Sequence, residues 1–571
     1  MGKTLRRILL LLPSLILAGC ATYGAGLNGA ISDLEKGDYQ GSAAKIEKSL
    51  SPTGSDRLLY YLELGMVRHL QGDYEASNQL LEMAERIAED LETSRVGDEL
   101  AVLMTNPRMG PYGGAEFERV LINYYKALNY LGLAEQAGDR NARLDALEGA
   151  RVEARRVIIK LNDINSRKGN YQQKKDEDEQ TFSKLMDIFS LLMGNLVKTS
   201  DWEYRDDAMA HYLAGLSFEM NGEYDDARIS YQKAAEAYEG GFVKQYFLDP
   251  EVTYQAWFDV IRMMRWAGGY ENDWPALAKK KLNDSWRKQL DDWTPDKAQV
   301  VVLEDKGLAP QRKEMNLELS VNPGLRSLQL RPYLIGNDRD ELAWFYVLYA
   351  DKNLYGLVSA YLNITRSTYQ PVFFTKTVPL GPLWYSAEQL GLIKAIGSSM
   401  RVTVPYYSPL QPEGPSRLTV EGQSLPMLKS SSPGMIAVQE QLVTAGADIR
   451  AALARSAFKA LTAMSAGQAA SDDKSTASLF ALAGKLVAQL TDAAETRNWL
   501  LLPNDIRLRR VVLAPGEHTL ELDSTLQAGG EAHKRQPVSL KAGEIYLWRV
   551  RTLTQGGDSK STVKKLIQTS D

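Results

Sequence analysis

Residues 208–238 read AMAHYLAGLSFEMNGEYDDARISYQKAAEAY, and they indicate the architecture of the N-terminal half of the chain. Two runs with helical apolar spacing flank the turn Gly222-Glu223-Tyr224. Small residues recur at Ala214, Gly215 and Ala227, where they let two helices approach closely, while larger residues fill the space to the next pair. The stretch therefore predicts a pair of antiparallel helices that stacks on further pairs.

The same pattern recurs earlier in the chain. Residues 29–50 surround the turn Gly37-Asp38-Tyr39, and residues 58–90 surround Gly72-Asp73-Tyr74. A further pair, 116–133 and 144–161, keeps the apolar periodicity but has a longer linker. These turns resemble the tetratricopeptide repeat, which implies a curved helical solenoid. The alternative is a plain helical bundle in which the Gly-x-Tyr turns arise by chance.

In a repeat solenoid the first helix of each pair lines the concave side. On this interpretation the groove carries Met209, Tyr212 and Glu219 from one helix, and Asn123 and Tyr124 from another. Methionine and tyrosine offer adaptable apolar area, which suits recognition of a protein segment. We therefore predict a groove for an envelope protein. The alternative is that a neighbouring part of the chain covers these residues.

After residue 295 the apolar period changes from helical to two. Met315, Leu317, Leu319 and Val321 alternate with polar residues, as in a strand with one buried face. The fold class expected is α+β multidomain: a tetratricopeptide-like solenoid, then β-rich, sandwich-like domains with an inserted helical pair. The predicted ranges are 20–295 for the helical repeats, 296–430 for a β-rich domain, 431–498 for the helical segment, 499–555 for a small β-domain and 556–571 for a disordered tail.

The first twenty residues have the layout of a secretory signal. Lys3, Arg6 and Arg7 precede an apolar run that ends in Leu17-Ala18-Gly19-Cys20. The tetrad resembles the bacterial lipobox, which implies a signal peptide over 1–19 and acylation of Cys20. Two or more acyl chains hold a protein stably on a bilayer. Ala21, in place of Asp, implies the outer membrane in the sorting rule of such lipoproteins, so we expect a lipid anchor on its periplasmic face. An ordinary cleaved signal or a buried thiol are the alternatives.

Composition limits the function classes. The net charge of -5 is small for 571 residues and gives no reason to expect nucleic-acid binding. Cys20 is the only cysteine, so the stability of the chain must come from packed cores rather than disulfides. Without spare cysteines or a His-Glu-x-x-His motif among the four histidines, we predict no metal site and no cofactor.

A catalytic set is not predicted either. Ser-x-x-Lys occurs five times, at Ser42, Ser285, Ser456, Ser471 and Ser561, without the Ser-Asp-Asn and Lys-Thr-Gly motifs of the serine acyltransferases. Glycosidases use a pair of carboxyl groups, but such pairs are common in any chain with 72 acidic residues. The sequence therefore does not exclude a glycosidase.

The lipobox, the helix 118–131, the stretch 402–407 and the stretch 496–503 together resemble a family of tetratricopeptide-containing bacterial lipoproteins of unassigned function. The resemblance implies an envelope location and a partner-binding role, and it supplies no catalytic residues. The leading hypothesis is a non-enzymatic adaptor that offers its groove to an envelope protein. The alternative is a protein that binds or cleaves peptidoglycan or another glycan with its β-rich half, and a weaker one is a structural link between outer membrane and cell wall.

Overall fold

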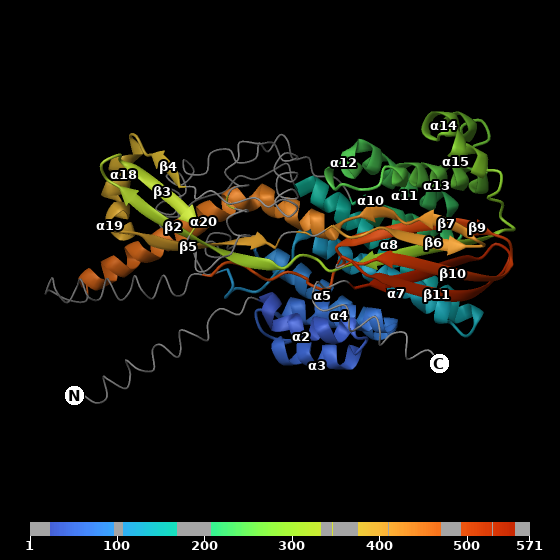
Figure 1. The fold of residues 1–571 in the computed structure, drawn as a ribbon, viewed down its shortest axis with the longest axis horizontal. Helices are drawn as coiled ribbons and strands as arrows, with labels where there is room; N and C mark the ends of the chain where they lie inside the picture. Colours follow the sequence, from blue (N-terminus) through green and yellow to red (C-terminus); the bar gives the residue numbers. More distant parts are fainter. Residues whose placement is uncertain are drawn as a thin grey trace.

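The computed structural model describes residues 23–95, 107–167, 207–332, 345, 375–408, 410, 412–469, 493–527 and 529–553. They form a mixed structure of helix and sheet (Figure 1), as the predicted α+β class requires. Several predicted parts lie outside the described residues: the signal peptide 1–19, Cys20, residues 470–492 of the helical segment 431–498, and the tail 556–571.

The N-terminal half consists of helices that pack in antiparallel pairs. The pairs are α2 with α3, α4 with α5, α7 with α8, and α10 with α11. Their bounds are Tyr23–Glu35, Tyr39–Ser49, Arg57–Gln71, Tyr74–Arg95, Glu116–Gln136, Arg140–Arg167, Ala208–Met220 and Tyr224–Ala237. After them come η2 (Tyr238–Phe242), α12 (Val243–Gln245), α13 (Glu251–Ala267), α14 (Trp274–Lys281) and α15 (Asp284–Gln289).

Glycines confirm the close approach expected within the pairs. A Cβ atom on Gly65 would lie 2.8 Å from the side chain of Leu81, and one on Gly215 would lie 2.7 Å from that of Tyr231. The turn residue Gly222 has a φ of 76°, a left-handed conformation that glycine adopts without steric penalty. As predicted from the sequence, small residues thus allow the two helices of a pair to approach closely, and a glycine occupies the turn between them.

The strands form three sheets, each of four strands among the described residues, in the orders β12-β1-β9-β8, β11-β10-β6-β7 and β4-β3-β2-β5. The strand bounds are Ala298–Lys306 (β1), Arg312–Asn322 (β2), Ser327–Pro332 (β3), Lys376–Pro379 (β4), Met400–Tyr407 (β5), Ser416–Val420 (β6), Gln423–Pro426 (β7), Leu428–Ser431 (β8), Asp505–Leu513 (β9), Gly516–Thr525 (β10), Glu531–Leu540 (β11) and Ile545–Thr552 (β12). The third sheet packs with α19 (Leu392–Ile396) and α20 (Pro433–Ala469), and α18 (Leu383–Gln389) packs on α19. The strand predicted over 315–321 lies in β2, where Met315, Leu317 and Leu319 are buried.

The predicted division of the β-rich half into separate domains 296–430 and 499–555 is wrong. β1, from the first range, pairs with β12 in parallel and with β9 in antiparallel orientation, both from the second range. β6 likewise pairs with β10. A common core between the two sheets includes Val300, Leu418 and Leu522. Strands far apart in sequence thus build one sandwich, which the alternation pattern of each strand cannot reveal.

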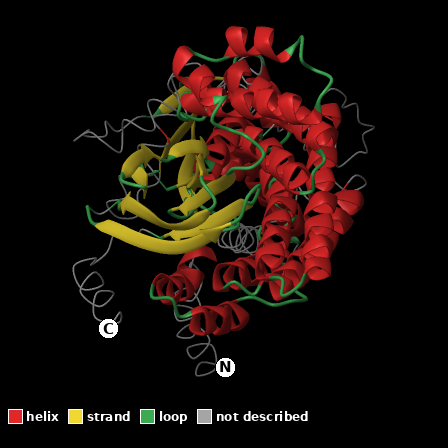
Figure 2. Ribbon diagram, turned by 90° about the vertical axis from the view of Figure 1, so that its right-hand side faces the viewer, coloured by secondary structure: helices red, strands yellow, loops and turns green. Residues whose placement is uncertain are grey.

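The helices form a curved layer, and the strands lie on its inner side (Figure 2). β1 is buried along its whole length, with Val300 in the core between the sheets and Val301 in the core shared with the helices. The concave side of the helical half is therefore covered by the chain's own first sheet.

Candidate functional site

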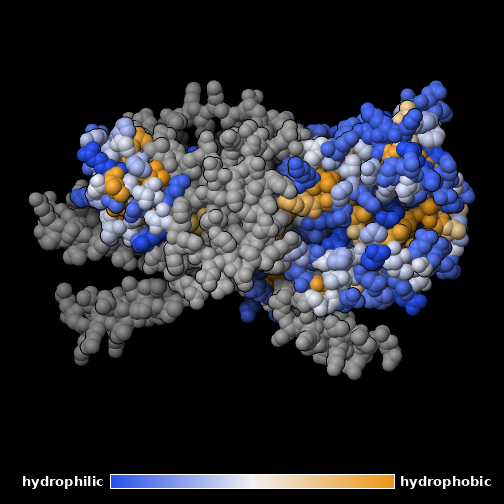
Figure 3. Space-filling view, turned by 45° about the horizontal axis from the view of Figure 1, so that its top comes forward, coloured by the Kyte–Doolittle hydropathy of each residue, from blue (hydrophilic) through white to orange (hydrophobic). Residues whose placement is uncertain are grey.

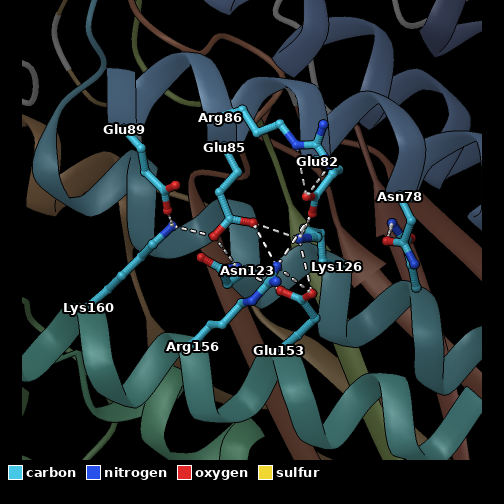
Figure 4. Close-up of polar contacts among 11 residues, drawn as sticks. Asn78, Glu82, Glu85, Arg86, Glu89, Asn123, Lys126, Glu153, Arg156 and Lys160 are labelled. Carbon is cyan, nitrogen blue, oxygen red and sulfur yellow. Dashed lines mark hydrogen bonds and ion pairs between the residues drawn. The ribbon is translucent and has the colours of Figure 1, made fainter. Parts of the chain in front are cut away.

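Asn123 lies in a buried network of charged side chains between three helices (Figure 4). Its side-chain amide donates to Glu85 Oε1 at 2.9 Å and to Glu153 Oε2 at 2.7 Å. Lys126 Nζ lies 2.6 Å from Glu85 Oε2 and 3.0 Å from Glu153 Oε1. We call this set, which lies on α5, α7 and α8 and also includes Glu82, Arg156 and Lys160, the α5–α7–α8 network.

The charges of this network compensate one another. Burial alone would raise the pKa of Glu85, but the ammonium groups of Lys160 and Lys126 outweigh it and hold that pKa at about 2. Neighbouring carboxylates raise the pKa of Lys126 in turn, against its burial. Glu85 and Lys126 therefore stay charged near neutral pH, and their ion pair joins α5 to α7.

Two of the three residues predicted on α10, Tyr212 and Glu219, lie in a second buried network, and the third, Met209, lies in the hydrophobic core. Glu219 accepts hydrogen bonds from Tyr231 Oη at 2.7 Å and from Arg510 Nη2 at 2.6 Å, and it also pairs with Arg262. Tyr212 Oη donates to Asp259 at 2.5 Å. Since Arg510 belongs to β9, this network joins the helical half to the first sheet.

The predicted groove is not open to a partner, and this part of the sequence prediction is corrected. All five residues are buried, with exposed fractions of 0% for Asn123, 1% for Tyr124, Met209 and Tyr212, and 3% for Glu219. The physical reason differs between the two helices: the neighbouring helices α5 and α8 cover Asn123, whereas the first sheet of the same chain meets the network around Tyr212 and Glu219. The alternative left open by the sequence, that another part of the chain covers these residues, is the one observed.

An irregular segment, 494–502, also lies against the helical half. The main-chain N–H of Trp499 donates to Glu118 at 2.8 Å, and those of Leu500 and Leu501 donate to Glu63 at 2.8 and 3.1 Å. Arg497 donates to the carbonyl oxygens of Pro107 and Gly110, each at 3.0 Å. The helical half thus holds this segment as a repeat protein would hold a peptide, but within one chain.

The two carboxyl groups that hold this segment are unlike those of the α5–α7–α8 network. Burial raises the pKa of Glu63 to about 8, although Tyr23 and the main chain of Leu500 and Leu501 donate to it. Burial likewise raises the pKa of Glu118. Sequence reasoning missed both residues, because a glutamate on a helix has no local signal that shows which distant main chain it binds.

An aromatic pocket of about 420 Å³ lies where the start of α11, the end of α13 and the connection to β1 meet. It is lined by Tyr224, Arg265, Trp266, Trp293, Thr294 and Pro295. The rings of Tyr224 and Trp266 stand nearly perpendicular, with centroids 5.7 Å apart. The face of the molecule drawn in Figure 3 is mainly hydrophilic, with apolar side chains gathered in a few patches.

A buried arginine packs against the two tryptophan rings of the aromatic pocket. The guanidinium of Arg262 lies 4.7 Å from the ring centroid of Trp266 and 5.4 Å from that of Trp293. Arg262 is itself held by Glu219 and Asp259. The buried network around Glu219 therefore keeps both indole rings in place.

Acidic residues are next to the pocket residues in the sequence. Asp225 and Asp226 follow Tyr224, while Asp292 and Asp296 flank the residues 293–295, and all four are exposed. Arg265, on the pocket wall, donates to the carbonyl of Leu290 and lies 5.2 Å from the ring of Trp274. The pocket can thus stack a flat apolar group, while carboxylates nearby attract cations or accept hydroxyl hydrogen bonds.

The histidines are engaged in the fold. Burial lowers the pKa of His69 to about 4, and its Nδ1 lies 2.6 Å from Asn129 Oδ1. His518 Nε2 lies 2.8 Å from the carbonyl oxygen of Ala514. Among the described residues, no group of three or more His, Cys, Asp and Glu side chains is arranged to hold a metal ion.

Comparison with protein-family models finds no match, and no curated protein is similar in sequence. None of the described helices is both long and apolar enough to cross a bilayer.

Proposed function

We propose that the protein is a non-enzymatic scaffold, anchored by lipid at Cys20 to the periplasmic face of the outer membrane, which binds an envelope protein. The helix pairs would be a tetratricopeptide-like solenoid, in keeping with the lipoprotein family that the sequence resembles. The binding surface is the aromatic pocket rather than the covered groove.

The observation that carries this proposal is the contrast between the buried networks and the aromatic pocket. The charged groups of the two networks neutralise one another inside the fold. The aromatic pocket instead presents the half-buried side chains of Tyr224, Arg265 and Trp266, with the buried indole of Trp293 behind them. Tyrosine, tryptophan and arginine dominate the binding energy of protein interfaces. The exposed aspartates beside it favour a partner segment with an apolar anchor flanked by Lys or Arg.

Site-specific photo-crosslinking in intact cells tests the proposal. A photoreactive amino acid at Thr294 is expected to trap an envelope protein, and Trp266→Ala in the same chain is expected to abolish the adduct. The matched control is the same amino acid at Tyr385, an exposed aromatic residue on α18, where we expect no such adduct. If position 294 gives no adduct, or if position 385 gives the same adduct, the aromatic pocket is not the binding surface.

A second candidate function is binding of a peptidoglycan strand in the same pocket. Pyranose rings have flat apolar faces that pack on aromatic rings, and their hydroxyl groups pair with nearby carboxylates and arginine. Because all the residues that line the pocket lie between 224 and 295, outside the β-rich half, the full chain is the one to test. Sedimentation with purified sacculi, lost in Trp266→Ala but kept in Tyr385→Ala, would favour this function over protein binding.

A further inference from the structure

The anchor and the folded body are separated by almost no chain. α2 begins at Tyr23, so only Ala21 and Thr22 lie between it and Cys20. Even when fully extended, three Cα-to-Cα steps span at most about 11 Å. The Cα atom of Tyr23, where α2 begins, therefore lies within about 11 Å of the Cα atom of Cys20.

The first turn of α2 is tightly docked on the rest of the molecule. Tyr23 is 8% exposed, and its hydroxyl donates to Glu63 Oε1 at 3.0 Å. A Cβ atom on Gly24 would lie 2.9 Å from the side chain of Gln311, which donates to Asn28 at 3.1 Å. Since Glu63 also holds the main chain of Leu500, one carboxyl group ties the start of α2 to α4 and to the C-terminal half.

The end of α3 lies beside this turn. Ser49 Oγ donates to the carbonyl of Gly26 at 3.4 Å, and Lys45 Nζ donates to that of Gly29 at 3.2 Å. Lys48, next to Ser49, is exposed, and a cation at this place suits anionic headgroups. We call the start of α2 and the end of α3, represented by Tyr23, Gly26, Lys48 and Ser49, the proximal edge.

We propose that the proximal edge rests on the phospholipid headgroups of the leaflet that holds the acyl chains, so that the body has a fixed orientation on the membrane. This inference rests on the proposed lipid anchor. α2 and α3 lie on one long side of the molecule, and α13 and α14 lie on the opposite side (Figure 1). The helix α13, whose end lines the aromatic pocket, thus lies on the side of the body that is farther from the bilayer.

Fluorescence quenching on vesicles tests this orientation. Because acylation consumes the only native cysteine, Lys48→Cys and Lys280→Cys each add a unique thiol, at an exposed lysine of α3 and of α14 respectively. The full-length acylated protein is reconstituted into phosphatidylethanolamine–phosphatidylglycerol vesicles with a headgroup-linked quencher. We expect several-fold stronger quenching of a fluorophore at position 48 than at position 280, and equal or reversed quenching would overturn the orientation.

A longer tether provides the control. A Gly/Ser insertion of about 20 residues between Thr22 and Tyr23 would give a mean end-to-end distance of about 25 Å. We expect it to leave acylation intact and to reduce the quenching at position 48 toward that at position 280; unchanged quenching would overturn the role of the short tether. Mass spectrometry separates the two proposals, because an unmodified thiol at Cys20 would refute the anchor itself.

Discussion

The protein buries carboxyl groups in two different ways. In the α5–α7–α8 network, Glu85 lies among Lys126, Lys160 and Arg156. Beside the segment 494–502, Glu63 instead accepts hydrogen bonds from main-chain N–H groups and a tyrosine. The pKa of Glu85 is lowered to about 2 and that of Glu63 is raised to about 8. Cations thus hold Glu85 charged between the helices, whereas Glu63 joins α4 to the segment 494–502 without a cation.

The largest effect is expected from the centre of the α5–α7–α8 network. Lys126→Met removes the buried one of the two cations that Glu82, Glu85 and Glu153 share; the other, Arg156, is partly exposed. We therefore expect a loss of about 3–5 kcal/mol in the free energy of unfolding. Chemical denaturation measures it, with the exposed Lys48→Met as control. A loss equal to that of the control would show that Arg156 and Lys160 suffice to hold the helices together.

A smaller effect is expected where main-chain groups are the donors. Glu63→Ala leaves the N–H groups of Leu500 and Leu501 without their acceptor, and we expect a loss of about 2–3 kcal/mol. Because the segment 494–502 ties the two halves, proteolysis within it should also become faster. Glu47→Ala, at an exposed position of α3, is the control and should change neither quantity; if Glu63→Ala behaves like it, the segment is held by its apolar contacts alone.

The smallest effect per step is a difference in the pH dependence of the free energy of unfolding, of about 1.4 kcal/mol per pH unit at most. The pKa of Glu63 is raised by folding from 4.5 to about 8, so its contribution is complete below pH 4.5 and is lost as the pH rises through 8. The pKa of Glu85 is lowered to about 2, so its contribution is present above pH 4.5 and is lost as the pH falls through 2.

Unfolding measured from pH 3 to pH 9 on Glu63→Gln and Glu85→Gln separates the two signs, since glutamine does not titrate. The advantage of the native chain over Glu63→Gln should shrink toward alkaline pH. Its advantage over Glu85→Gln should shrink toward acid pH. Parallel curves for the two variants would mean that both carboxyl groups are held in the same way.

Much of the local structure could be predicted from the sequence, while the candidate site could not. Gly215 and Tyr231 touch across two consecutive helices that one short turn joins. A contact of this kind can be predicted from the local pattern of small and large residues. The aromatic pocket joins Tyr224 and Trp266 to Trp293, and no periodicity links these residues. Segment 494–502 has no periodicity at all, and in the sequence it contributes only to a family resemblance.

The sequence by itself determined the helix pairs, their turn glycines and the alternation of single strands, because each depends on residues within one or two turns or strands. Only the tertiary structure decided that β1 pairs with β9 and β12 and that the first sheet fills the concave side of the helices. The physical reason is that burial and strand pairing depend on which distant surfaces meet. A polar residue such as Asn123 or Glu219 fits an open groove and a satisfied core equally well until its partners are known.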